Sequence, residues 1–248
     1  MKSLRCAFAF LTRLPVGDAA FDGRDVGRAL GWFPVVGLTV GLIQWGVLLL
    51  TSALPPWVSA TLATVVMALV TGAFHLDALA DMADGFGGGH TRADVLRIMR
   101  DHVIGAYGGV ALILGLSLRI GVVASLVTLG HAGAWVCAAA AVAKWSSALL
   151  GWRLPYARRE SSGVGSAVTD HMGWPELLQS TTAAVLIAAI VLGWYGGLAV
   201  LTTLVVTVIM GRWCMRRIGG VTGDTLGATT ELSELAILTL GLLVERLA

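Results

Sequence analysis

Residues 29–76 read ALGWFPVVGLTVGLIQWGVLLLTSALPPWVSATLATVVMALVTGAFHL, an unbroken run that contains no Asp, Glu, Lys or Arg. A helix needs about 20 apolar residues to cross the hydrocarbon core of a bilayer, so this run is long enough for two spans. The turn-forming sequence LPPW at residues 54–57 divides it near its middle. The stretch therefore predicts a helical hairpin in a membrane.

The rest of the chain has the same character. Hydrophobic residues make up 56% of the sequence and charged residues 13%, about half the charged share of ordinary soluble domains. Two more hairpins are predicted, over about 107–152 with a turn at 130–133, and over 177–211 with a turn at 194–197. We expect an all-α fold, a single integral membrane domain over residues 1–248 with about six transmembrane helices in three hairpins.

The two ends of the chain differ from the hairpins. Residues 1–28 mix apolar and charged side chains and lack a small-residue cleavage site behind a short apolar core, which favours an interfacial helix over a signal peptide. Near the C-terminus the charge-free stretch 235–244 is too short to span a bilayer, so we expect a short helix, partly buried or at the interface. Cys6, Cys137 and Cys214 are too few and too scattered for a disulfide framework, and we interpret them as packing residues.

Thirty-two glycines allow helices to approach one another closely. Gly37 with Gly41, and Gly105 with Gly109, have the small-xxx-small spacing that is typical of packed membrane helices. We interpret both pairs as packing sites and not as ligand sites.

Basic residues gather in the segments that flank the predicted hairpins, and none lies in a hairpin turn. They are Lys2, Arg5, Arg13, Arg24 and Arg28 before the first hairpin, Arg92, Arg97 and Arg100 after it, Arg153, Arg158 and Arg159 after the second, and Arg212, Arg216 and Arg217 after the third. With six spans all these segments fall on one side, which the positive-inside rule makes the cytoplasm. Topology explains the basic residues, and they lack interleaved aromatic residues, so we expect a lipid bilayer as partner and no nucleic acid.

Three carboxylates follow the first hairpin, in the sequence FHLDALADMADGFGGG at residues 74–89. Asp77, Asp81 and Asp84 have the spacing i, i+4, i+7, which places them on one face of a helix. Like charges on one face repel by about a few tenths of a kcal/mol per pair, which favours a bound cation. Mg²⁺ takes one or two carboxylates together with water and substrate phosphates, so we predict that this acidic stripe holds Mg²⁺. A solvated acidic helix end is the alternative.

A second polar group lies near the C-terminus, where Asp224 and Glu231 are again seven positions apart. In a helix these two carboxylates share a face. Glycines before Asp224 would let backbone N–H groups approach a phosphate at the start of that helix. The alternative is a plain helix start with Asp224 as N-cap.

Several cations are candidates for binding an anion. Arg158 and Arg159 precede a stretch rich in Ser and Gly, which suits phosphate oxygens but also describes an ordinary loop. Arg97 and Arg100 either follow the positive-inside rule or bind the substrate, and the sequence favours neither interpretation. Arg119 and Lys144 fall near the middles of the two helices of the second hairpin, where a cation is costly. Each either reaches the acidic stripe or a substrate phosphate, or extends to the membrane interface.

Five stretches together carry a family resemblance. They are FLTRLPV at 10–16, HLDALADMADG at 75–85, MRDHVIGAYG at 99–108, PYAR at 155–158 and GDTLGATTE at 223–231. In this order and over most of the chain they resemble the cobalamin synthase family, the adenosylcobinamide-GDP ribazoletransferases. The acidic stripe shows no departure from the family pattern, and Ala78 stands where the family often has glycine.

The resemblance implies an enzyme of the bacterial inner membrane with its active site facing the cytoplasm. It would join adenosylcobinamide-GDP to α-ribazole or α-ribazole 5′-phosphate, releasing GMP, with Mg²⁺ as cofactor. On this interpretation Asp77, Asp81 and Asp84 hold one or two Mg²⁺ ions, with Asp224 and Glu231 completing the site. A homodimer is a further arrangement that a membrane enzyme of this size allows.

Three arginines and one histidine are candidates for contacting the substrates. Arg100, Arg158 and Arg159 are the candidates for binding the substrate phosphates. His75 could act as general base for the attacking ribose hydroxyl. Two residues at about 100° each place it on the opposite side of a helix from Asp77, so a structural role is the alternative, with Asp84 as the next candidate base.

Two other enzyme families and one other class of protein share single features with the chain. The sequence DMADG at 81–85 begins like the motif of CDP-alcohol phosphotransferases, but the Ala-Arg and G-x3-D-x3-D that should follow are missing. Asp77 and Asp81 fit one D-x3-D motif of membrane prenyltransferases, and only one is evident. A membrane anion transporter with Arg119 and Lys144 along its path is the third hypothesis. Against it, the carboxylates cluster at the cytosolic surface and we expect none inside the spans.

Overall fold

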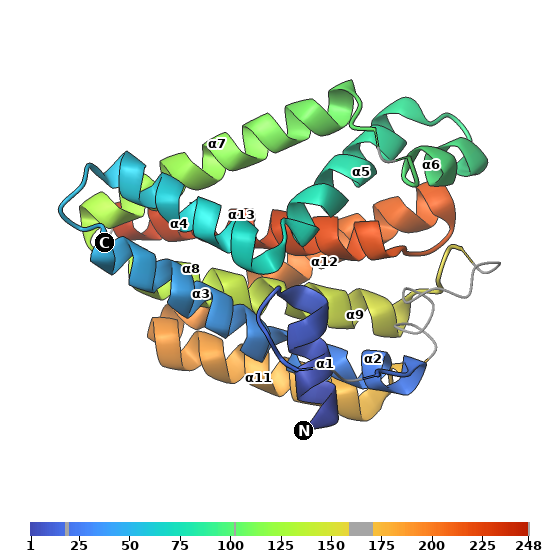
Figure 1. Cartoon of the computed structure of the whole chain (residues 1–248), viewed down its shortest axis with the longest axis horizontal. Helices are drawn as coiled ribbons and strands as arrows, with labels where there is room; N and C mark the ends of the chain where they lie inside the picture. The colour runs from blue at the N-terminus through green and yellow to red at the C-terminus, as the bar shows by residue number, and fades with distance from the viewer. Residues whose placement is uncertain (18–19, 102, 159–170, 248) are drawn as a thin grey trace.

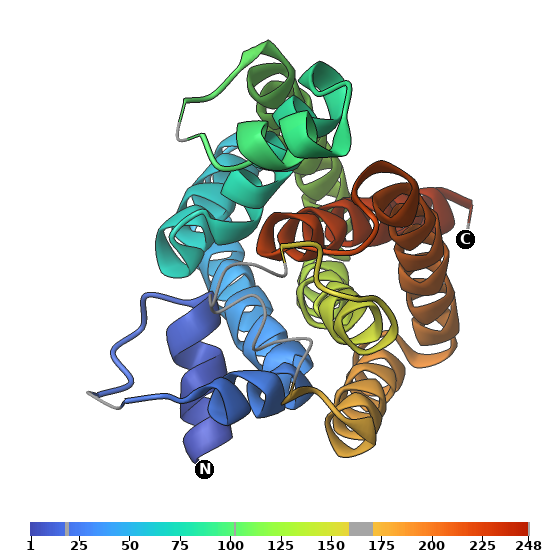
Figure 2. The ribbon, with the colours of Figure 1, turned by 90° about the vertical axis from the view of Figure 1, so that its right-hand side faces the viewer.

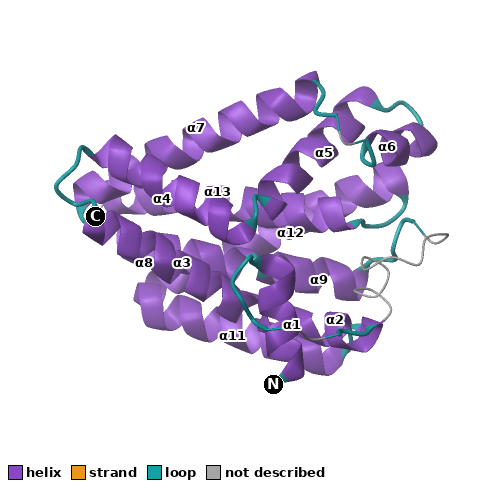
Figure 3. Ribbon diagram, in the orientation of Figure 1, coloured by secondary structure: helices purple, strands orange, loops and turns teal. Residues whose placement is uncertain are grey.

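The computed structural model describes residues 1–17, 20–101, 103–158 and 171–247. Within these ranges the chain is almost wholly helical and forms no β-strand (Figure 3), which confirms the predicted all-α class. The helices are α1 (Lys2–Leu11), α2 (Gly23–Ala29), η1 (Leu30–Trp32), α3 (Phe33–Leu50), α4 (Pro56–Thr71), α5 (Phe74–Gly88), α6 (Arg92–Ile98), α7 (Ala106–Leu129), α8 (Ala132–Ala143), α9 (Trp145–Arg153), α11 (Trp174–Leu192), η2 (Gly193–Tyr195), α12 (Gly196–Ile218) and α13 (Gly223–Leu247).

The predicted hairpins are present in the described part of the chain. They are α3 with α4, α7 with α8 and α9, and α11 with α12, and each turn falls where the sequence placed it. At the last turn Gly196 lies against the backbone of Ala188, so α12 folds back along α11. Five described helical stretches are long and apolar enough to cross a membrane, or six if the bent pair α4 and α5 forms one span. The prediction of a multi-pass helical membrane protein is therefore confirmed.

The charged segments and the uncharged turns lie at opposite ends of the molecule. Figure 1 shows the α3–α4 and α7–α8 turns beside the C-terminus at the left, and α2, α6 and the end of α9 at the right. The start of α13 also lies at the right-hand end, close to the end of α12. Helix α5 runs from its corner with α4, near the middle of the view, toward this same end, so the acidic stripe and the start of α13 lie in the same half of the molecule.

The chain turns sharply between α4 and α5, whose axes differ by 88°. Gly72 and Ala73 form the corner with φ values of +63° and +58°, and Ala73 is the one described residue other than glycine with a positive φ. This left-handed conformation is costly for a residue with a Cβ. The acidic stripe on α5 therefore does not continue the axis of the preceding apolar helix.

Helix α13 differs from the short C-terminal helix that the sequence predicted. It runs for 25 residues from Gly223 and contacts α5, α7, α8, α9 and α12. Figure 2 shows it, in dark red, crossing the middle of the bundle. Ile237 and Leu238 pack there in the same buried cluster as Trp135. The prediction was wrong because Glu231 and Glu234 interrupt the apolar stretch, although both carboxylates are neutralised inside the protein.

The neutralising partner is Arg119 on α7. Its Nη2 lies 2.7 Å from Glu231 Oε1 and its Nη1 lies 2.7 Å from Glu234 Oε1, and its side chain is 1% exposed. Lys144, at the junction of α8 and α9, places Nζ 3.9 Å from Glu234 Oε2. The expectation that the spans contain no acid is wrong. Arg119 and Lys144 neither reach the acidic stripe nor extend to the interface, because α13 supplies their counter-charges.

The glycine predictions have different outcomes. Gly37 and Gly41 of α3 face the backbone of α8 so closely that a Cβ on either would collide with it, which confirms this pair as a packing site. Apart from the backbone of its own helix, no described atom lies within 4 Å of the position of a Cβ at Gly109, so this glycine is not part of a packing pair. Close approach instead occurs at Gly105 and Gly108, where the neighbour is a carboxylate.

The N-terminal segment forms a helix, as predicted. Helix α1 buries Ala7 and Leu11 against α2, η1 and α3. Its interfacial position stays a prediction. Cys6, Cys137 and Cys214 are all buried and free, in agreement with a packing role.

Candidate active site

The acidic stripe occupies the middle of α5. Asp77 is exposed, Asp81 is half-buried and Asp84 is 8% exposed, so the three carboxylates run from the surface into the protein. The charges of Asp77, Asp84 and Asp224 all act on Asp81. Asp224 comes from α13, far later in the chain. The structure therefore brings Asp224, one member of the second acidic group that the sequence singled out, close to the acidic stripe.

Asp84 also connects α5 to α7. Its Oδ2 accepts a hydrogen bond from the Gly105 backbone N–H at 2.7 Å, and its Oδ1 accepts one from the Gly108 N–H at 2.8 Å. A Cβ at either glycine would overlap the carboxylate. The carboxylate thus caps the N-terminus of α7, where a negative charge is also favoured by the helix dipole. This contact explains the GAYG sequence at 105–108.

The start of α13 is tied to the PYAR loop. Backbone hydrogen bonds of 2.8 Å and 2.9 Å join Ala157 N–H to Val221 C=O and Val221 N–H to Pro155 C=O. This pairing brings Arg158 Nη2 within 3.0 Å of Asp224 Oδ2. The PYAR and GDTLGATTE sequences, which are widely separated in the chain, therefore form one wall of the site.

Thr222 caps helix α13. The Thr225 N–H donates to Thr222 Oγ1 at 3.2 Å, and Thr225 Oγ1 accepts a hydrogen bond from the Thr222 N–H at 2.8 Å. Asp224 is therefore not the N-cap that one interpretation of the sequence proposed. Its carboxylate is left to face Arg158 and the cavity.

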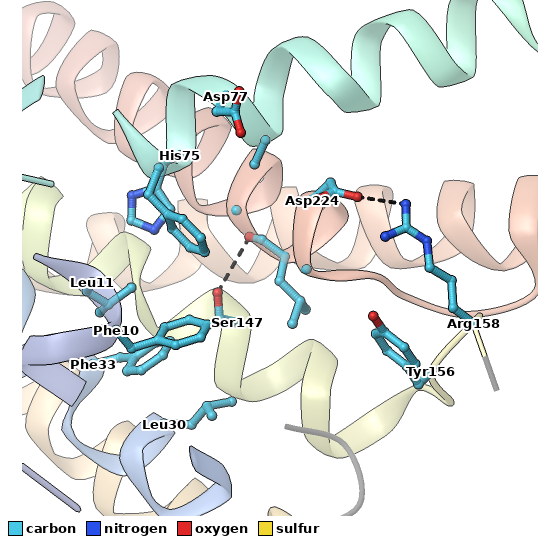
Figure 4. Close-up of a pocket in the computed structure, with 15 residues that line it drawn as sticks. Phe10, Leu11, Leu30, Phe33, His75, Asp77, Ser147, Tyr156, Arg158 and Asp224 are labelled. Carbon is cyan, nitrogen blue, oxygen red and sulfur yellow. Dashed lines mark hydrogen bonds and ion pairs between the residues drawn. The ribbon is translucent and has the colours of Figure 1, made fainter. Parts of the chain in front are cut away.

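A cavity of about 230 Å³ lies where α1, α3, α5, α9 and α13 converge (Figure 4). Asp77, Asp224, Arg158 and Tyr156 contribute polar groups to its lining, and most of the remaining lining is apolar. Burial raises the pKa of the Tyr156 hydroxyl above its usual value, so it remains a protonated donor at neutral pH.

His75 lines the same cavity as Asp77 and is 6% exposed. The helical rotation between the two residues predicted opposite sides of α5. Both nevertheless line the cavity, together with residues of the start of α13 (Figure 4). The roles of His75 as general base or as a structural residue both remain predictions.

A second cavity, of about 740 Å³, adjoins the first on the side of Arg158. Arg92, Arg97 and Arg100 line it, so Arg158 borders both cavities. Arg92 is held by carbonyl groups, since it donates to Ile218 C=O and Ala157 C=O at 2.8 Å.

Arg97 and Arg100 differ from Arg92 in having no such anchor. Both side chains are exposed, and neither makes a hydrogen bond or an ion pair with another described residue. The sequence left Arg97, like Arg100, open between a topological and a substrate-binding role, and the structure places both at this cavity. Arg159 lies outside the described residues.

Glu231 does not line either cavity. It is 1% exposed and bound to Arg119, so the structure places it in the buried charge cluster and not beside Asp224. Asp224 and Glu231 belong to one helix, α13, as predicted. Asp224 lines the cavity, whereas Glu231 lies further along the helix in the centre of the bundle, paired with Arg119.

Among the described residues, no three His, Cys, Asp or Glu side chains gather closely enough to hold a metal ion on their own. Mg²⁺ keeps several waters and uses one or two carboxylates together with phosphate oxygens. Asp77, Asp81 and Asp224 offer the hard oxygen donors that this ion prefers. These residues fit a Mg²⁺ ion that binds together with a diphosphate, and not a closed protein cage.

Gly227 controls how closely α13 approaches α5. A Cβ at this position would lie 2.6 Å from the Cβ of Ala78. We expect Gly227→Ala to force the helices apart at a cost of about 1–3 kcal/mol. Since a displacement of about 1 Å can lower a rate about 100-fold, the activity of the site and its thermal stability should both fall.

A reciprocal exchange tests this prediction. Ala78→Gly with Gly227→Ala moves one methyl group from α5 to α13 and should restore most of both properties. Gly121→Ala is the control, because no atom lies within 4 Å of the Cβ position there. Thermal unfolding in detergent and turnover by the wild type and these variants are the measurements, and a Gly227→Ala variant as active as the wild type would contradict the prediction.

A model of the family described as cobalamin-5-phosphate synthase matches residues 3–242. The chain is 40% identical over 246 residues to the adenosylcobinamide-GDP ribazoletransferase of Klebsiella pneumoniae subsp. pneumoniae, covering 96% of this chain and 98% of that protein. It is 40% identical over 245 residues to the protein of that name from Rhizobium etli (94% and 93% coverage), and 37% identical over 248 residues to that from Chlorobaculum parvum (96% and 93%). No solved structure matches the chain significantly.

Proposed function

Because the chain belongs to the cobalamin-5-phosphate synthase family, we propose that it transfers the phosphocobinamide group of adenosylcobinamide-GDP to α-ribazole or α-ribazole 5′-phosphate. The observation that carries the proposal is that Asp77, Asp224 and Arg158 line one cavity, with Asp81 near enough for the charges of all three to act on its carboxyl group. Carboxylates next to arginines suit a substrate that brings a diphosphate and its metal ion.

The proposed reaction is the substitution of one phosphoryl substituent. A ribose hydroxyl of the ribazole attacks the phosphorus atom next to cobinamide, forming a new P–O bond. The bond from that phosphorus to the bridging oxygen breaks, and GMP leaves with the bridging oxygen. The hydroxyl proton passes to a base, for which His75 and Asp84 are the candidates.

Mg²⁺ is the proposed cofactor. Bound together with the diphosphate, Mg²⁺ would supply positive charge that offsets the charge of the phosphates and of the departing nucleotide. Asp77, Asp81 and Asp224 would hold it. Asp84 belongs to the same predicted set, and its two hydrogen bonds to α7 also fix the position of α5.

Arginines bind the phosphates in this proposal. The predicted residues are Arg100, Arg158 and Arg159. Arg97 lines the same cavity as Arg100 and could bind a phosphate in the same way. Arg158 borders both cavities and so lies where the phosphates would meet the acids.

Replacing Arg100 with Ala tests the phosphate contact. A charge-assisted hydrogen bond contributes about 1.5 kcal/mol or more, so we expect KM for adenosylcobinamide-GDP to rise about tenfold with little change in KM for α-ribazole. Arg153→Ala is the matched control, because Arg153 lines a separate groove between α9 and α12. Equal KM values for the Arg100 variant and the wild type would remove Arg100 from the site.

The function itself is tested with the purified protein in detergent, adenosylcobinamide-GDP, α-ribazole and Mg²⁺. The proposal expects GMP and a cobalamin product to appear together, and both to stop when a chelator removes the metal. Turnover that a chelator leaves unchanged would contradict the metal proposal alone. A folded protein that releases no GMP would contradict the function.

The other two functions to consider are an anion transporter and a CDP-alcohol phosphotransferase. Arg119 and Lys144, the proposed path of a transporter, are paired with Glu231 and Glu234 and so leave the transporter hypothesis without its supporting observation. A CDP-alcohol phosphotransferase would share the metal chemistry, and substrate assays separate the two.

The proposal also includes the membrane that the protein occupies and the side on which its site lies. We place the multi-pass protein in the bacterial inner membrane with the site on the cytoplasmic side, supported by the gathering of basic segments at one end (Figure 1). A homodimer remains compatible with this placement.

A further inference from the structure

We propose that the apolar part of the cavity between α1, α3, α5, α9 and α13 binds the aromatic base of α-ribazole. This inference rests on the proposed function and assigns one of its two substrates to a defined place. The cavity lies directly beside Asp77 and Asp224, so a group bound there is next to the proposed reaction centre.

The cavity wall is built from aromatic rings. Phe10, Phe33 and Phe74 line it, together with Leu11 and Leu30. The Phe10 and Phe33 rings are stacked with centroids 5.9 Å apart, and the Phe74 ring meets Phe10 edge-on at 5.4 Å. Rings arranged in this way present both faces and edges, which favour a flat aromatic ligand over an aliphatic one.

The size of the cavity selects between the two substrates. Pockets that hold a whole drug-sized molecule span roughly 300–1,000 Å³, so about 230 Å³ accepts one small ring system. α-Ribazole carries a benzimidazole, which is a flat bicyclic base. A corrin macrocycle is far too large, and guanine is more polar than this apolar lining suits.

The polar lining then orients the ribose. With the base among the phenylalanine rings, the ribose hydroxyls face Asp77, Asp224 and the Tyr156 hydroxyl. The neighbouring basic cavity begins at Arg158 and extends to Arg97 and Arg100, which suits the diphosphate of the second substrate. The attacking hydroxyl and the phosphorus would thus approach one another near the Arg158–Asp224 pair.

The proposal gives the N-terminal helix a role in substrate recognition. Phe10 belongs to α1, and Leu30 belongs to η1, which follows α2. The FLTRLPV sequence therefore contributes two side chains, Phe10 and Leu11, to the site, whereas its composition predicted only an interfacial segment.

Phe10→Leu is the first test, because leucine keeps an apolar side chain and removes the ring. We expect KM for α-ribazole to rise about tenfold, which corresponds to about 1.4 kcal/mol, while KM for adenosylcobinamide-GDP stays within about twofold. Phe86→Leu is the matched control, since Phe86 packs in a different cluster, against Trp213. Thermal unfolding of both variants shows whether the fold is kept, and Phe74→Leu serves as a second cavity variant if Phe10→Leu does not fold.

Benzimidazole alone is the probe for the subsite. It should compete with α-ribazole but not with adenosylcobinamide-GDP, and calorimetry should show that it binds wild-type protein more tightly than the Phe10→Leu variant. Two results would overturn the subsite in a protein that still releases GMP. One is an unchanged KM for α-ribazole in the cavity variants, and the other is equal affinity of wild type and Phe10→Leu for benzimidazole. Failure of the proposed function shows differently, as absence of GMP release by the wild type.

Discussion

Replacing Asp81 with Asn is expected to lower the rate of GMP release at saturating substrates by at least about 100-fold, the effect of removing one electrostatic stabiliser from an active site. Asp81 is the carboxylate on which the charges of Asp77, Asp84 and Asp224 all act. Asparagine has the same shape and no charge, so it removes the attraction for Mg²⁺ with little change in packing.

Stability separates this prediction from a structural explanation. Removing one of several like charges relieves repulsion, so the Asp81→Asn protein should unfold at the same temperature as the wild type or higher. Glu245→Gln is the control, because Glu245 accepts a hydrogen bond from Trp135 Nε1 on helix α8 and glutamine can still accept it. Full activity of Asp81→Asn with normal Mg²⁺ dependence would exclude Asp81 from the metal site.

Arg119→Met is expected to give the largest loss of stability, about 3–5 kcal/mol. Glu231 and Glu234 would remain buried with Lys144 as their only cation among the described residues. Two carboxylates against one ammonium group leave an uncompensated charge in the centre of the bundle. Thermal or denaturant unfolding in detergent measures the loss.

A second substitution should restore the balance of charge. Arg119→Met combined with Glu231→Gln leaves Glu234 with Lys144, one charge of each sign. We expect this double variant to recover most of the lost stability, since neutral groups of similar volume are tolerated where a broken pair is not. If the double variant were less stable than Arg119→Met, the charge-balance explanation would fail.

The hairpins could be predicted because the length of a charge-free stretch decides whether it can cross a bilayer. The same reasoning underestimated the length of α13, because a hydropathy average treats Glu231 and Glu234 as unpaired charges. It contains no information about Arg119, their partner on a helix much earlier in the chain. The corner at Gly72 and Ala73 could not be predicted from the sequence either, because alanine rarely adopts a positive φ.

The site was predictable where helical spacing alone determines it. The stripe on α5 and the position of Asp224 at the start of α13 followed from spacing, and their meeting required the fold. Tyr156 and Phe10 were not singled out, although both lie within the sequences PYAR and FLTRLPV that carried the family resemblance. An aromatic residue gives no chemical signal of its own until the cavity it lines is known.

The pairing of Arg119 with α13 also has a consequence for how the chain enters the membrane. Insertion of a helix with arginine at its centre costs about 2.5–3.5 kcal/mol for that residue, and the two glutamates that neutralise it lie 112 and 115 residues later. Because a ribosome adds about 5–20 residues per second, Glu231 and Glu234 are synthesised on the order of ten seconds after α7. Biogenesis is therefore complete only when the last helix is delivered, and a chain truncated before Glu231 should be recognised by membrane proteases.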